Sequence, residues 1–72
     1  MDKIVKDFGN FIKARRIEKG LSQEEVAKEL RISQQTYGRY ELGIREVGLQ
    51  MIVDIGHILD FEPGDFFDYY SE

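Results

Sequence analysis

Helix start and stop signals follow one another closely in the first two thirds of the chain. Gly20 is typical of a helix C-terminus, where the backbone turns in a left-handed conformation. Ser22 and Glu25 have the spacing of a capping box, in which each side chain bonds a backbone N–H group at the start of a helix. Ser33 is the next N-cap residue, and Gly43 is the next stop. These signals leave room for only two short helices joined by a tight turn.

Apolar periodicity predicts three further helices. Apolar residues recur at helical spacing between Ile4 and Ile12, whereas residues 49–59 are apolar around most of the helix circumference. The latter helix is therefore either the central packing element or a surface that also touches a partner. Pro63 suits the first turn of a last helix. No segment alternates long enough for a strand, so we expect an all-α fold of five short helices in a single domain over residues 1–72, with helices at about 3–19, 23–30, 34–42, 49–59 and 63–69.

The composition excludes several classes of protein. A chain of 72 residues with no Cys and one His has neither a disulfide framework nor the usual ligands of a metal site, and it is too short for an enzyme with a deep cleft. We expect no metal, no cofactor and no catalytic activity, and we expect His57 to be a surface residue. The longest apolar run is only a few residues, and the start of the chain lacks the apolar region of a secretory signal. We therefore expect no membrane association.

The net charge of −4 is unevenly distributed along the sequence. Residues 1–46 hold all ten basic residues and eight acidic ones, whereas residues 47–72 hold six acidic residues and no basic one. A nucleic-acid phosphate backbone attracts Lys and Arg, so the overall charge argues against nucleic-acid binding but the first segment does not.

Residues 8–67 resemble the Cro and lambda-repressor-like helix-turn-helix family, also called the XRE family. The resemblance rests on the segments K-G-L-S-Q-E-E-V-A at 19–27 and S-Q-Q-T-Y-G-R-Y-E-L-G at 33–43, and on the apolar residues that follow from Leu49 to Leu59. It implies a helix-turn-helix at about residues 23–42, with compatible packing residues at Val26, Ala27, Leu30, Ile32, Tyr37 and Tyr40.

Three residues depart from the family pattern. Arg31 stands where the turn usually has Gly, so a non-glycine residue is expected in the left-handed conformation. Tyr37 is bulkier than the usual aliphatic residue, and Gly38 replaces a small polar one. These departures affect the exact orientation of the third helix, not its existence.

The resemblance implies that the third helix enters the major groove of DNA. Gln34 and Gln35 are the main candidates for base contacts, because an amide can both donate to and accept from adenine. Thr36, Gly38 and Arg39 are further candidates for base contacts. The candidates for phosphate contacts are Gln23, Ser33 and Arg45.

The resemblance also implies a largely buried salt bridge between Arg16 and Glu41. This pair would tie the first helix to the end of the third. Removing one partner would leave an uncompensated buried charge.

The aromatic residues near the C-terminus allow two interpretations. In one, Phe61, Phe66 and Phe67 close the last helix over the core. In the other, aromatic side chains form a dimer or partner contact, for which the candidates are Phe61, Phe67, Tyr69 and Tyr70. Residues 68–72 form an acidic, aromatic tail that we expect to face away from DNA.

The leading hypothesis is a sequence-specific regulator, most simply a repressor. As a homodimer it would bind a near-palindromic operator in double-stranded DNA. The alternative is the antitoxin of a toxin–antitoxin pair, in which the same motif binds DNA and the acidic C-terminal segment binds a basic protein partner. A third possibility is a protein-interaction module that has lost DNA binding, which the net charge of −4 favours. The resemblance implies a cytoplasmic protein of prokaryotic or phage origin.

Overall fold

The computed structural model describes residues 2–70, and in this part of the chain all regular structure is helical. The helices are α1 (Lys3–Glu18), α2 (Gln23–Leu30), α3 (Gln34–Leu42), α4 (Leu49–Leu59) and α5 (Pro63–Tyr69). The all-α prediction is confirmed, and the predicted boundaries agree to within one residue, since Lys19 caps α1 instead of continuing it. None of the described helices is both long and apolar enough to cross a lipid bilayer.

Local capping interactions fix the ends of α2. Ser22 Oγ accepts from the backbone N–H of Glu25 at 3.0 Å, and Glu25 Oε1 accepts from that of Ser22 at 2.8 Å. Arg31 caps the other end in the left-handed conformation, with φ 60° and ψ 40°. Both the predicted capping box and the predicted conformation of Arg31 are present.

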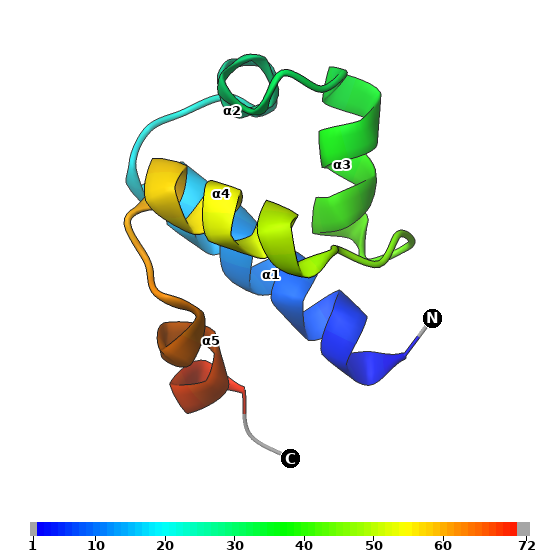
Figure 1. The fold of residues 1–72 in the computed structure, drawn as a ribbon, viewed down its shortest axis with the longest axis vertical. Helices are drawn as coiled ribbons and strands as arrows, with labels where there is room; N and C mark the ends of the chain where they lie inside the picture. Colours follow the sequence, from blue (N-terminus) through cyan, green and yellow to red (C-terminus); the bar gives the residue numbers. More distant parts are fainter. Residues whose placement is uncertain (1, 71–72) are drawn as a thin grey trace.

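The helices are arranged along the long axis of the molecule (Figure 1). α1 and α4 lie at the centre, with α2 and α3 at one end of the molecule and α5 at the other. Gly9 allows α1 to approach the end of α3 closely, because a Cβ atom at this position would lie 2.5 Å from the backbone oxygen of Glu41. The helix-turn-helix is therefore held against α1 at very short range.

Aromatic side chains fill the core between α1, α4 and α5. The rings of Phe11 and Phe61 meet edge to face with centroids 4.9 Å apart, and those of Phe8 and Phe66 do so at 5.2 Å. Such edge-to-face pairs stabilise beyond the area that they bury. The side chains of Ile12, Val26, Tyr37, Ile55 and Leu59 are fully buried around this cluster.

The structure corrects part of each interpretation of the C-terminal aromatic residues. Phe61 is 4% exposed, so its assignment to a dimer or partner contact was wrong: the chain turns back after α4 and inserts this ring beside Phe11. Phe67 is 61% exposed, so its assignment to the core was wrong, whereas Phe66 is buried. Tyr70 is half-buried against Phe66. Successive residues of α5 point to different sides of the helix, and the composition alone does not show which side faces the core.

Candidate nucleic-acid interface

The residues predicted to contact bases lie on the solvent side of α3. Gln34, Gln35 and Arg39 are exposed, and Thr36 and Gly38 are half-exposed. The opposite side of the helix carries Tyr37, Tyr40 and Glu41, all of which are buried. The helix thus presents amide and guanidinium groups to solvent, while its other side is packed in the core. It lies at the end of the molecule that is distant from α5 (Figure 1).

Ser33 fixes the N-terminus of this helix. Its hydroxyl oxygen accepts from the backbone N–H of Thr36 at 3.1 Å, and the hydroxyl donates to Thr36 Oγ1 at 2.9 Å. An N-cap of this kind satisfies a backbone donor that has no partner within the helix. The Ser33 hydroxyl is therefore engaged in capping, and the Thr36 side chain is oriented by it.

A nearly buried ion pair connects α3 to α1. Arg16 Nε donates to Glu41 Oε2 at 2.6 Å and Arg16 Nη2 to Glu41 Oε1 at 3.1 Å, a two-pronged arrangement. Arg16 Nη1 also donates to the backbone oxygen of Leu21 at 2.9 Å. The side chains of Arg16 and Glu41 are 12% and 2% exposed, so the pair implied by the family resemblance is formed out of contact with most solvent.

Gln23 joins the same network from α2. Its Nε2 donates to Glu41 Oε1 at 2.9 Å, so the side chain that we expected at a phosphate has one amide N–H directed into the protein. Gly38 lies beside it, since a Cβ atom there would be 3.5 Å from Gln23 Oε1. One general rule points to this contact: a buried carboxylate has about four acceptor sites, and a two-pronged Arg pair uses only two of them.

These hydrogen bonds determine the charge of Glu41. Burial raises the pKa of this carboxyl, but the hydrogen bonds from Arg16 and Gln23, together with the positive charge of Arg16, outweigh burial, so the pKa lies below its ordinary value. Glu41 is therefore ionised at neutral pH. It holds α1, α2 and α3 together through one carboxylate.

The sequence analysis placed Tyr37 among the packing residues but did not predict that its hydroxyl would be buried beside this network. Its side chain is fully buried, and within residues 2–70 its hydroxyl is the buried side-chain polar atom without a hydrogen-bond partner. Burial raises the pKa of Tyr37, and the nearby Glu41 carboxylate raises it further. The ring fills the space under α3 at the expense of an unsatisfied hydroxyl.

Arg45 lies in the loop after α3 and is exposed. Its guanidinium lies 5.9 Å from the centroid of the Tyr40 ring, a cation–π distance. This contact holds a positive charge beside the C-terminal end of the motif. The candidate contacts thus extend from Gln23 in α2 to the loop that follows α3.

The remaining ionisable groups do not suggest a metal centre. Within the described part of the chain, no three His, Asp or Glu side chains are grouped so that they could hold a metal ion. His57 is exposed on α4.

A family model described as "Helix-turn-helix" matches residues 12–66, which is most of the chain. The SPbeta prophage-derived HTH-type transcriptional regulator YonR of Bacillus subtilis is 40% identical over 52 residues, which are 72% of this chain and 48% of that protein. The chain thus spans about half the length of this curated relative.

Two solved structures have the same fold. Both are crystal structures of the clp gene regulator ClgR from Corynebacterium glutamicum, each 22% identical to this chain. One superposes with a TM-score of 0.86 over 94% of this chain and 88% of the other, and the second with 0.87 over 93% and 71%. At this level of identity the likeness establishes the arrangement of the helices.

Proposed function

Because the chain belongs to the helix-turn-helix family whose model matches residues 12–66, we propose that it is a DNA-binding transcriptional regulator that reads the major groove with α3. The observation that carries this proposal is the division of α3 into two sides. Gln34, Gln35 and Arg39 face solvent, while the opposite side is anchored through Glu41 to α1 and α2. A helix anchored on one side and exposing amides on the other is suited to hydrogen bonding with base edges.

The roles of the exposed side chains follow from their chemistry. The amides of Gln34 and Gln35 each offer a donor and an acceptor that match N7 and N6 of adenine, and Arg39 suits guanine or a phosphate. Thr36 would offer its methyl group to a thymine methyl, and Gly38 would allow close approach of the backbone. Base preference in this proposal comes mainly from the two glutamines.

Phosphate contacts would position the motif on the duplex. Arg45 is exposed and would contribute a full positive charge, whereas Gln23 and Ser33 lie at the N-terminal ends of α2 and α3, where the helix dipole favours an anion. Since Ser33 and Gln23 already make internal hydrogen bonds, we assign the main phosphate contact to Arg45. The net charge of −4 does not oppose this, because the acidic excess lies after residue 46.

We further propose that the protein binds a near-palindromic operator as a homodimer and represses transcription by covering it. A single short helix and few phosphate contacts favour two copies on half-sites roughly 34 Å apart. The exposed rings of Phe67 and Tyr69, 61% and 59% exposed, are the proposed dimer contact at the end of α5. The acidic tail would then face away from DNA.

Selection of bound duplexes from a random pool tests this function. We expect enrichment of one sequence in two inverted copies with centres about 10 base pairs apart, and binding that weakens steeply as salt is raised. His57→Ala, an exposed change on α4, is the control and should select the same sequence. If no duplex is enriched even at low salt, the protein is instead a protein-interaction module with this fold.

A further inference from the structure

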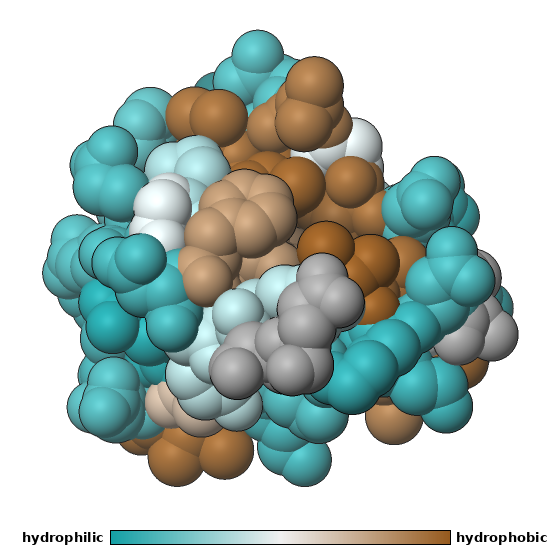
Figure 2. Space-filling model, turned by 90° about the horizontal axis from the view of Figure 1, so that it is seen from below, coloured by the Kyte–Doolittle hydropathy of each residue, from teal (hydrophilic) through white to brown (hydrophobic). Residues whose placement is uncertain are grey.

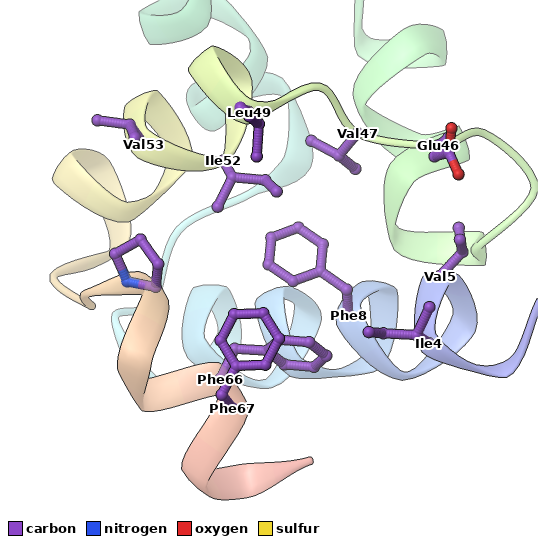
Figure 3. A pocket seen from close by; sticks show the side chains of 11 residues that line it. Ile4, Val5, Phe8, Glu46, Val47, Leu49, Ile52, Val53, Phe66 and Phe67 are labelled. Carbon is purple, nitrogen blue, oxygen red and sulfur yellow. The ribbon is translucent and has the colours of Figure 1, made fainter.

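The molecule exposes two surfaces of different character. Between α1, α4 and α5 lies an apolar groove of about 330 Å³, lined in part by the buried rings of Phe8 and Phe66 (Figure 3). Figure 2 shows apolar side chains gathered on this face of the molecule. The solvent side of α3 is polar instead, and in the middle of this helix Gly38 is half-exposed and carries no side chain. The packing of the chain does not explain why this position is a glycine.

Neither the backbone nor the space within the fold requires a glycine at residue 38. Gly20 and Gly43 adopt a positive φ, whereas Gly38 does not. A Cβ atom at Gly9 would lie 2.5 Å from a backbone oxygen, but one at Gly38 would lie 3.5 Å from Gln23 Oε1, an ordinary contact distance. Glycine in the interior of a helix is less stable than alanine. The chain therefore loses stability at residue 38 without a gain in its own packing.

Three glutamine side chains border the space that a side chain at residue 38 would fill. Gln34 and Gln35 precede Gly38 by four and three residues, so they are its neighbours on the surface of the helix. Gln23 approaches from α2: its Nε2 donates to Glu41 at 2.9 Å, and its Oε1 is the atom nearest to an added Cβ. Amide groups thus surround a position where the surface of α3 is only the α-carbon of Gly38.

The chemistry of this arrangement matches one kind of base pair. In the major groove an A·T pair presents N7 and N6 of adenine beside O4 and the C5-methyl group of thymine. A glutamine amide can bind the adenine atoms, and the thymine methyl group then needs a small apolar contact. The α-carbon of Gly38 offers such a contact, and the missing side chain leaves room for one methyl group. A G·C pair has no methyl group to fill that space.

We propose that Gly38 determines specificity by receiving the C5-methyl group of a thymine, in the base pair whose adenine is bound by Gln34. This role rests on the proposed function of α3 as the DNA-reading helix, and it adds which base pair is selected and why the helix contains a glycine. Thr36 carries a methyl group of its own, but it lies two residues earlier and nearly on the opposite flank of the helix. It would therefore contact a different base.

Removing the methyl group from the DNA and adding one to the protein tests this role. The probe is the operator selected from random duplexes, with each thymine replaced in turn by uracil, which lacks only the C5-methyl group. For the wild type, we expect uracil in the base pair read by Gln34 to weaken binding about fourfold, the effect of one buried methyl group. Gly38→Ala should bind the unmodified operator about tenfold more weakly, because its Cβ takes the place of the thymine methyl group. The same variant should bind the uracil operator at least as tightly as the unmodified one.

Two controls separate recognition from folding. Gly38→Ala should melt at the temperature of the wild type or above it, since alanine favours a helix. Gly64→Ala in α5 is the matched variant, because nothing lies within 4 Å of its added Cβ, and it should keep both the affinity and the thymine preference of the wild type.

Two results would overturn the proposal: full operator affinity of Gly38→Ala, or equal losses at every uracil for that variant and the wild type. The uracil scan of the wild type needs no variant, so the absence of a loss in the base pair read by Gln34 also overturns it. If the wild type selects no duplex at all, the proposed function itself fails, which is a separate result.

Discussion

Arg16 and Glu41 lie 25 residues apart in sequence, and Arg16 Nε donates to Glu41 Oε2 at 2.6 Å in the interior of the helix-turn-helix domain. Because Glu41 also accepts from Gln23, this one carboxylate connects three helices. The orientation of α3 relative to the rest of the molecule therefore depends on it.

Replacement of one partner should destabilise the protein strongly. Arg16→Met leaves a carboxylate that is 2% exposed without its cation, which we expect to lower the free energy of unfolding by about 3–5 kcal/mol. The double variant Arg16→Met/Glu41→Leu should recover much of this loss, since it removes both charges. Chemical denaturation measures the free energy of unfolding of the single and the double variant, with Lys13→Met on the exposed side of α1 as the control. Equal stability of the wild type and the single variants Arg16→Met and Glu41→Leu would contradict this account of the pair.

The same pair predicts how stability depends on pH. The folded-state pKa of Glu41 lies below its ordinary value of 4.5, so its contribution to stability is present above about pH 4.5 and is lost as the pH falls through the folded pKa. The double variant lacks this carboxyl. We expect its melting temperature to fall less than that of the wild type on acidification from about pH 6 to pH 3. Parallel curves for the two proteins would show that Glu41 does not contribute.

Removal of the Tyr37 hydroxyl should not destabilise the protein. The hydroxyl is buried and makes no hydrogen bond to any of residues 2–70, so Tyr37→Phe keeps the packing of the ring and removes an unsatisfied polar group. We expect the free energy of unfolding to stay the same or to rise by about 1 kcal/mol. A loss of stability in urea denaturation would indicate that the hydroxyl bonds to the Glu41 carboxylate in solution.

The contact between α1 and α3 has no room for a side chain at Gly9. Gly9→Ala would place Cβ 2.5 Å from a backbone oxygen, which forces the helices apart and should lower stability by about 1–3 kcal/mol. Gly64→Ala in α5 is the matched control, because nothing lies within 4 Å of its added Cβ. We expect that variant to be neutral or slightly more stable, as Ala favours helix over Gly. Similar thermal stability of the two variants would contradict the close crossing.

Local signals account for what the sequence predicted well. The Ser22–Glu25 capping box, the Gly43 stop and Pro63 each act within one helical turn, so they locate helix ends without knowledge of the fold. The left-handed conformation of Arg31 followed from its place in the turn. Asp60 adopts the same conformation at the end of α4 and was not predicted, because Asp carries a weaker signal for it than Gly.

Contacts between distant segments account for what the sequence did not predict. The bond from Gln23 to Glu41 and the burial of Phe61 depend on how the helices cross and on the turn after α4. The apolar character of residues 49–59 left open whether this helix is the central packing element or also touches a partner. Only the packed structure shows that this helix, with Ile4 and Phe67, lines a groove.

The most direct test of the central claim is the binding of the selected operator by α3 variants. We expect Gln34→Ala and Gln35→Ala to lose about 1–3 kcal/mol of discrimination at individual base positions, and Arg39→Ala to weaken binding, in fluorescence anisotropy at fixed salt. All three side chains are exposed, so the variants should melt like the wild type. His57→Ala should bind as the wild type does. Unchanged operator affinity and base preference in all three α3 variants would contradict the assignment of this helix as the DNA-reading surface.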